Sequence, residues 1–210
     1  MALEIIPFIL GPIENNTYLV IDGNTKQASI VDPSFDSIKL LEHAREHDYQ
    51  ITQIWCTHAH FDHIVGINDL MPKINPTPSV FLHPDDLPLW NSHGGAKMFG
   101  VPFEVKFQPT ILLKDNDSFV LGQIKIQTSI TPGHTKGHVI YNIPNEKVVF
   151  SGDLIFRMSV GRTDLPGGNQ LELLQSIDNV IKILPEETRL LSGHGPETTV
   201  GYEKKYNPFL

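Results

Sequence analysis

Apolar and polar residues alternate along this chain with two different periods, and the first half predicts mainly strands. Runs of Ile, Leu, Val and Phe, separated by short turns of Gly, Asn and Pro, indicate an antiparallel meander at the start. A segment with helical spacing and a Ser or Asp cap follows. The predicted elements are strands over residues 3–10, 16–22 and 27–33, a helix over 34–48, a strand over 51–57, a short helix over 64–74 and a strand over 79–83.

The second half alternates hairpins with one long amphipathic helix. A Pro followed by two acids at residues 84–86 starts a helix, and the Gly-rich residues 91–110 predict an irregular loop, either mobile or lining a substrate site. The remaining predicted elements are hairpins over 117–134 and 138–153, a helix over 169–184 with Leu171, Leu174, Ile177, Ile181 and Leu184 on one side, a strand over 188–195 and a solvated tail segment at Tyr202–Lys205.

Strands that come before, between and after helices favour sheets covered by helices. The length of 210 residues and the 40% hydrophobic content suit one compact α/β domain with a sizeable core. The chain shows no internal repeat, low-complexity segment or obvious linker. We therefore predict a single α/β domain that spans residues 1–210.

Composition narrows the classes of function. The formal net charge of −8 argues against a protein whose main function is to bind nucleic acid, because such binding needs clustered Lys and Arg. No apolar run approaches the roughly 18 residues of a membrane-spanning helix, and the N-terminus does not resemble a signal peptide. The single cysteine, Cys56, excludes an internal disulfide. A cytoplasmic protein with a small-molecule substrate is the expectation, and the oligomeric state stays open.

Residues 56–66, CTHAHFDHIVG, follow directly on an apolar strand and hold most of the candidate chemistry. His58, His60, Asp62 and His63 lie within six positions there. Three further polar side chains stand beside glycines at the ends of later apolar strands, namely His134, Asp153 and His194. Because strand ends from one sheet can meet at a shared edge, the sequence predicts that five histidines and two aspartates converge.

This set of side chains suits divalent metal ions such as Zn²⁺, Fe²⁺ or Mn²⁺. Seven ligands are too many for one tetrahedral site and fit two neighbouring ions with a carboxylate between them. A single His-x-His pair is common, and such histidines can also serve only to satisfy backbone groups. The coincidence of all seven at strand ends favours the metal site. Zn²⁺ is the simplest choice, with Fe²⁺ and Mn²⁺ as alternatives.

The motifs THAHFDH, PGHTKGH, SGD and GHGP resemble, in the same order, those of the metallo-β-lactamase superfamily. The resemblance covers essentially the whole chain and implies an αββα sandwich with two metal ions at one edge of its sheets. It assigns His58, His60 and His134 to the first ion. Asp62, His63 and His194 are assigned to the second ion, and Asp153 bridges the two.

Residues 156–169 and the ending after His194 look like those of glyoxalase II-like proteins, the hydroxyacylglutathione hydrolases. That resemblance implies hydrolysis of S-lactoylglutathione-like thioesters by a metal-bridging hydroxide, with Asp62 and Asp153 orienting the nucleophile. Full-length glyoxalase II carries an added helical C-terminal domain with glutathione-binding residues. This sequence ends about sixteen residues after His194, so glutathione recognition cannot be carried over.

Side chains near these motifs are candidates for binding substrate. Arg157, Arg162 and Lys136 could hold a substrate carboxylate, and His93 could line the pocket. The alternatives are salt bridges or support of loops for the cations, and a solvent-exposed loop for His93. Cys56 is interpreted as a packed core residue rather than a nucleophile.

Three other activities of the same superfamily remain open. A persulfide dioxygenase-like oxidoreductase would use one iron held by His58, His134 and Asp153. Lactone or β-lactam hydrolysis would use the same two-metal site. An RNA-processing nuclease is disfavoured by the acidic balance of the chain. A non-enzymatic scaffold is disfavoured because all seven ligand positions are intact.

Overall fold

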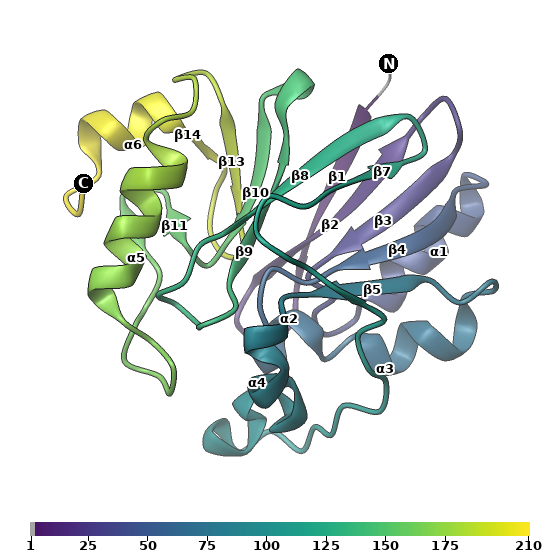
Figure 1. Cartoon of the computed structure of the whole chain (residues 1–210). Helices are drawn as coiled ribbons and strands as arrows, with labels where there is room; N and C mark the ends of the chain where they lie inside the picture. Colours follow the sequence, from purple (N-terminus) through teal and green to yellow (C-terminus); the bar gives the residue numbers. More distant parts are fainter. Residues whose placement is uncertain (1–2) are drawn as a thin grey trace.

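A computed structural model describes residues 3–210 of the chain. Two six-stranded sheets lie face to face, and helices cover the outer face of each (Figure 1). The predicted αββα sandwich is therefore confirmed. None of the helices in the described residues 3–210 is both long and apolar enough to cross a membrane.

The first sheet carries the N-terminal strands in their chain order. β1, β2 and β3 pair antiparallel, as the predicted meander requires, and β3, β4, β5 and β6 then pair in parallel. The strands are β1 Leu3–Leu10, β2 Asn15–Asp22, β3 Gln27–Val31, β4 Gln50–Trp55, β5 Ser79–Leu82 and β6 Ile111–Leu112.

The second sheet is built from two hairpins and the last part of the chain. Its order is β14-β13-β10-β9-β8-β7, and β10 and β13 form its parallel pair. The strands are β7 Ser118–Leu121, β8 Ile124–Ile130, β9 Val139–Ile143, β10 Val148–Gly152, β13 Arg189–Ser192 and β14 Thr198–Thr199. A separate small hairpin pairs β11 Ile155–Phe156 with β12 Ser159–Val160.

The helices lie outside the sheets or beside their common edge (Figure 1). The α-helices are α1 Ile38–Glu46, α2 Phe61–Ile64, α3 Ile67–Leu70, α4 Leu87–Asn91, α5 Gln170–Ser176 and α6 Val200–Tyr206. Short helices of other types are η1 Met71–Lys73, η2 Pro84–Asp86, η3 His93–Phe99, η4 Pro144–Glu146 and the π-helical turn η5 Ile177–Ile181.

The space between the sheets is filled by large apolar side chains. Trp55 of the first sheet stacks on Tyr141 of the second, with ring centroids 5.4 Å apart, and Phe150 packs edge-on against Trp55. All three side chains are fully buried. β2 is buried on both faces, because Tyr18 and Val20 face this inner core while Leu19 and Ile21 face α1. Burial of this apolar area holds the two sheets in a fixed relation.

The strand directions explain why polar side chains far apart in the sequence meet. β3 and β4 run parallel, as do β10 and β13, and β8 also runs in the direction of β10 because each pairs antiparallel with β9. Parallel strands end at the same edge of a sheet. The hydroxyl of Tyr141 donates to the backbone oxygen of Cys56 at 2.9 Å and so ties the two sheets together near that edge.

Several predicted elements differ from the structure. The helix predicted over residues 64–74 is divided into the end of α2, then α3 and η1. The loop predicted as irregular over 91–110 contains η3, and Phe103 in it is buried against Trp90 in the same apolar cluster. In α5, Leu171 was expected on the buried side but is 66% exposed, whereas Leu173 is fully buried. The π-helical turn that follows shifts the apolar stripe away from a 3.6-residue period.

The predicted solvated tail is instead helix α6, and its Glu203 is fully buried. The Glu203 carboxylate accepts hydrogen bonds from the backbone nitrogen of Met158, 2.9 Å away, and from the side chains of Asn207 and Thr198. These partners supply the hydrogen bonds that a buried carboxylate requires. The tail prediction was wrong because these partners come together only in the folded chain.

Leu173 and Leu171 form a matched pair for testing how α5 packs. We expect Leu173→Ala to lower the free energy of unfolding by about 2–5 kcal/mol, because it leaves a cavity in a buried cluster. Leu171→Ala should change the free energy of unfolding by less than about 0.5 kcal/mol, since that side chain lies in solvent. Urea denaturation of the two variants measures both values. Equal losses would contradict an orientation of α5 that buries Leu173 and exposes Leu171.

Candidate metal centre

The seven predicted ligands all lie at the edge where the two sheets meet. Each follows a strand end or begins the short helix beside it, so the sheet directions bring them together. His58 and His60 follow β4, Asp62 and His63 belong to α2, His134 follows β8, Asp153 follows β10 and His194 follows β13. All are buried except His194, which is partly exposed.

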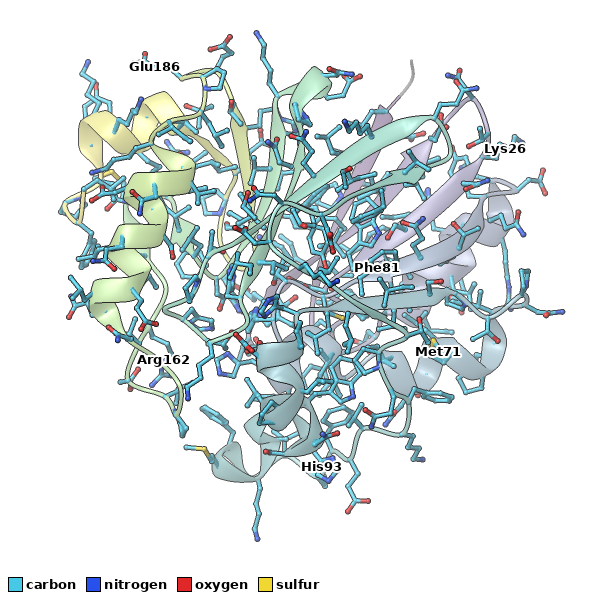
Figure 2. The ribbon with its side chains drawn as sticks, in the orientation of Figure 1. Lys26, Met71, Phe81, His93, Arg162 and Glu186 are labelled. Atoms are coloured by element: carbon cyan, nitrogen blue, oxygen red, sulfur yellow. The ribbon has the colours of Figure 1, made fainter. Side chains whose placement is uncertain are left out.

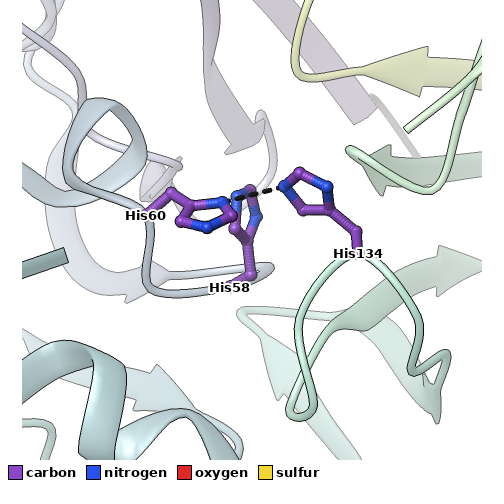
Figure 3. Close-up of side chains that lie close together, drawn as sticks. All are labelled: His58, His60 and His134. Atoms are coloured by element: carbon purple, nitrogen blue, oxygen red, sulfur yellow. Dashed lines mark hydrogen bonds between the residues drawn. The ribbon is translucent and has the colours of Figure 1, made fainter. Parts of the chain in front are cut away.

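Three histidines form one group. The side chains of His58, His60 and His134 point toward one another, and one ring nitrogen of each lies within 4.8 Å of the others (Figure 3). Nδ1 of His60 is 2.8 Å from Nε2 of His134. His58 and His60 lie two residues apart on an extended segment, and His134 reaches them from the second sheet.

The second group contains Asp62, His63 and His194. Oδ2 of Asp62 lies 3.3 Å from Nε2 of His63 and 3.3 Å from Nε2 of His194. Asp153 lies between the two groups. Its Oδ1 is 3.5 Å from Nε2 of His63, and its Oδ2 is 3.5 Å from Nε2 of His134. One carboxylate therefore faces both triads.

The histidine rings are oriented by hydrogen bonds at the nitrogen that faces away from the shared space. In three of them Nδ1 has a carbonyl or carboxylate acceptor, so this nitrogen donates and Nε2 is the acceptor atom of the neutral ring. The three bonds join His63 to Oδ2 of Asp32 at 3.0 Å, His134 to the backbone oxygen of Arg162 at 2.7 Å and His194 to the backbone oxygen of Ile13 at 3.2 Å.

The charge states of the two groups differ. Burial lowers the pKa of His58 well below its ordinary value. It also lowers the pKa of His60 to about 3, with a further contribution from His134. Both imidazoles are therefore neutral near pH 7, the form that coordinates a metal ion.

The environment of His63 is dominated by carboxylates. Burial acts to lower its pKa, but the charges of Asp62 and Asp153 outweigh burial and raise the pKa well above its ordinary value. Burial acts to raise the pKa of Asp62 and of Asp153, and His63 reverses this effect, so both pKa values are lowered. Buried negative charge of this density requires a positive partner, either a proton on His63 or a bound cation.

Among the seven predicted ligands, all of which lie in the part of the chain that the structure describes, two have a buried atom without a hydrogen-bond partner, namely Nε2 of His58 and Oδ1 of Asp153. A buried polar atom without a partner costs free energy, and both of these atoms border the shared space. Imidazole nitrogens and carboxylate oxygens together are a donor set that Zn²⁺, Fe²⁺ and Mn²⁺ accept. The residues present therefore fit divalent metal ions.

Comparison with known proteins agrees with this geometry. The family model described as "Metallo-beta-lactamase superfamily" matches residues 10–194. The chain belongs to the metallo-β-lactamase superfamily.

Two relatives match nearly the whole chain. A Bacillus subtilis (strain 168) protein named "Probable metallo-hydrolase YqgX" is 38% identical and covers 96% of this chain and 94% of its own. "Hydroxyacylglutathione hydrolase GloC" of Haemophilus influenzae (strain ATCC 51907 / DSM 11121 / KW20 / Rd) is 30% identical and covers 100% of this chain and 98% of its own.

Two solved structures are similar along their full lengths. A structure described as BLEG-1 B3 metallo-β-lactamase superposes with a TM-score of 0.89 at 37% identity, covering 99% of both chains. TTHA1623 in a di-iron-bound form superposes with a TM-score of 0.88 at 38% identity, covering 98% of this chain and 100% of that one.

Asp32 supports the site and is not among the residues predicted from the sequence. It follows β3, is buried, and adopts a positive φ of 50°. Its Oδ1 accepts from the backbone nitrogen of Thr57 at 2.7 Å, and its Oδ2 accepts from the Thr57 hydroxyl at 2.7 Å and from Nδ1 of His63. An Asp after an apolar strand in "SIVDP" was the available signal, but nothing in the sequence connects it to His63.

Asp86 is a second supporting carboxylate that the sequence suggested only as a helix start. It accepts hydrogen bonds from the backbone nitrogens of Ala59 at 2.9 Å and Gly137 at 2.8 Å, and from the Thr135 hydroxyl at 2.9 Å. These donors belong to the loop with His58 and to the loop with His134. Asp86 therefore joins the two loops that form the three-histidine group.

A cavity of about 620 Å³ opens beside the metal-site residues. His60, Asp62, His134, Asp153 and His194 all lie on its wall. A substrate in this cavity would therefore contact both groups of ligands.

The four predicted substrate-binding side chains are widely separated. Arg162 lines the cavity, and its guanidinium makes two 2.7 Å hydrogen bonds to Asp164. Arg157 lies over the ring of Tyr202, 4.8 Å from its centroid. Lys136 and His93 each line a different cavity, and Figure 2 shows His93 on the outer side of the lower helices, away from Arg162.

Two residues near the ligands are packed inside the protein. Cys56 is fully buried, and burial raises the pKa of its thiol well above the ordinary value. This environment agrees with a core role and opposes a thiolate nucleophile. Nε2 of His138 accepts from the backbone nitrogen of Asp153 at 3.1 Å, so His138 positions the backbone of that carboxylate.

Asp32 and Asp36 provide a matched test of the support for His63. Both have positive φ, but Asp36 is exposed and lies 3.7 Å from Lys39. We expect Asp32→Asn to weaken metal binding by roughly 10- to 100-fold, because an amide nitrogen would face the N–H of His63. Asp36→Asn should leave the affinity unchanged. Competition with a chelator for Zn²⁺ measures both affinities, and an unchanged affinity in Asp32→Asn would exclude this role.

Proposed function

We propose that this protein is a metal-dependent hydrolase that cleaves small-molecule thioesters. The observation that carries the proposal is the position of Asp153, whose two oxygens face the two triads of potential ligands. Two divalent ions held by such a set, when bound, lower the pKa of a water molecule and stabilise negative charge on a carbonyl oxygen. The name of the Haemophilus relative, a hydroxyacylglutathione hydrolase, supports thioesters as the substrate class.

The residues of this chain have separate tasks in such a reaction. His58, His60 and His134 would hold the ion that faces the substrate carbonyl, and Asp62, His63 and His194 the other. The carboxylates of Asp62 and Asp153 would orient the attacking water by accepting its hydrogen bonds. The leaving thiolate needs little help from an acid, because the pKa of a thiol, about 8.5, is far below that of an alcohol.

β-Lactam hydrolysis is the second candidate. It is favoured by the similarity to the structure described as BLEG-1 B3 metallo-β-lactamase, since a lactam carbonyl could use the same cavity.

Iron is a candidate metal beside zinc, because the similar chain TTHA1623 has a di-iron-bound form. A persulfide dioxygenase-like reaction would require one iron at His58, His134 and Asp153. It would leave Asp62, His63 and His194 as a ligand triad without an ion.

The test is thioester hydrolysis with metal content counted in the same sample. We expect the purified protein to hydrolyse S-lactoylglutathione or the acetyl thioester of N-acetylcysteamine, with about two divalent ions per chain. His60→Ala should lower turnover on the order of 100-fold or more, because it removes one of three imidazoles around an ion. His93→Ala is the matched control and should retain turnover, since His93 lines a different cavity.

Other results would redirect the assignment. Two ions per chain with no thioester turnover would contradict the proposal, and hydrolysis of a β-lactam or lactone under those conditions would establish the second candidate. One iron per chain with oxygen consumption on glutathione persulfide would replace the hydrolase by an oxidoreductase.

A further inference from the structure

The cavity beside the metal-site residues has an apolar wall that the proposed chemistry does not use. Its polar members are mainly the predicted ligands, and most other lining side chains are aromatic or aliphatic. The main apolar contributors are Phe35, Phe61, Phe99, Phe156, Val101 and Leu165.

Three of the phenylalanines form one continuous aromatic surface. Phe35 meets Phe61 edge-on with centroids 6.3 Å apart, and Phe61 meets Phe99 at 5.3 Å. They come from the segment after β3, from α2 and from η3, so the folded chain gathers them from three separate places. Phe99 remains 47% exposed at the cavity. An apolar surface left open beside a reaction site favours an apolar ligand.

The apolar wall continues past Phe99 and Leu165. A second cavity of about 150 Å³ shares His60, Phe99 and Leu165 with the first, and Leu89 and Met98 also line it. Gly94 also lines it with φ of 64°, and a Cβ there would lie 2.3 Å from the backbone nitrogen of Phe61. Glycine thus allows η3 to approach α2 closely, which places Phe99 against Phe61.

The charges around the cavity do not complement a strongly polar ligand. Within the described residues 3–210, Arg162 is the one Lys or Arg on the wall of the larger cavity, and Asp164 already binds its guanidinium. A hydroxyacyl group placed against Phe61 and Phe99 would lose its hydrogen bonds to water without replacement. An alkyl or aryl group there would gain free energy by leaving water.

We infer that this hydrolase selects thioesters with an apolar acyl group of medium length or an aryl acyl group. The thioester carbonyl would face His60 and Asp153, and the acyl chain would run along Phe61 and Phe99 toward Leu165. The inference rests on the proposed thioester hydrolysis and names the substrate class for it.

The test compares acyl groups on one thiol, so that differences come from the acyl side alone. The metal-replete protein is given the acetyl, lactoyl and hexanoyl thioesters of N-acetylcysteamine. We expect kcat/KM for the hexanoyl thioester to exceed that for the acetyl thioester by about tenfold or more, because each fully buried methylene contributes a factor of roughly three to four. The lactoyl thioester should gain no such advantage.

Substitution of two phenylalanines with the same exposed fraction tests whether the preference for the hexanoyl thioester arises at the apolar wall. Phe99 and Phe209 are each 47% exposed, but Phe209 follows α6 and does not line the larger cavity. Phe99→Ala should lower the ratio of kcat/KM for hexanoyl over acetyl severalfold, and Phe209→Ala should leave this ratio unchanged. Leu165→Asn is a second variant on the wall and should lower the ratio in the same direction.

The possible results distinguish a failure of this inference from a failure of the proposed thioester hydrolysis. Clear hydrolysis with acetyl or lactoyl preferred would overturn the apolar acyl site and leave thioester hydrolysis standing. A hexanoyl preference that survives in both Phe99→Ala and Leu165→Asn would overturn the placement of the chain on this wall. If none of the three thioesters is hydrolysed with both ions bound, the proposed function fails and this inference fails with it.

Discussion

The concentration of buried carboxylates beside imidazoles is the constraint on which this structure depends. Asp32, Asp62 and Asp153 are all within hydrogen-bond or ion-pair reach of His63, deep at the edge where the sheets meet. Unbalanced, such charges would oppose folding, because removal from water costs each ion several kcal/mol. A proton or a bound cation balances them, so the same arrangement that strains the fold without a cation favours metal binding.

The rest of the fold serves to hold these groups in place. Each ligand stands at a strand end, and the strand ends are positioned by the core between the sheets, where Trp55, Tyr141 and Phe150 interlock. Close packing of that kind changes little when a ligand binds. Asp86 adds direct bonds between the loops that carry the histidines of the first group. The metal-site residues are therefore preorganised, and the cavity beside them provides the remaining surface for selectivity.

Local pattern was a good guide where burial follows from a strand or helix period, and it failed where tertiary contacts decide burial. Both hairpins of the second sheet formed as predicted, because turn residues and alternating apolar positions lie close together in the chain. Leu171 and Glu203 were misjudged. A π-helical turn follows the helix that carries Leu171. Glu203 is buried because Met158, Thr198 and Asn207 donate hydrogen bonds to its carboxylate in the folded chain.

By itself the sequence predicted a single α/β domain and the set of ligand candidates, because apolar periods and strand-end motifs can be recognised in the linear chain. The αββα sandwich was implied by the resemblance of those motifs to the metallo-β-lactamase superfamily. Only the tertiary structure decided which side chains support them. Asp32 and His63 lie 31 residues apart, and Asp86 and Gly137 lie 51 apart, so no local period links them. The apolar wall was equally invisible, since Phe35, Phe61 and Phe99 become neighbours only when three segments pack together. Contacts between distant segments depend on the packing of the whole core, which a local pattern does not contain.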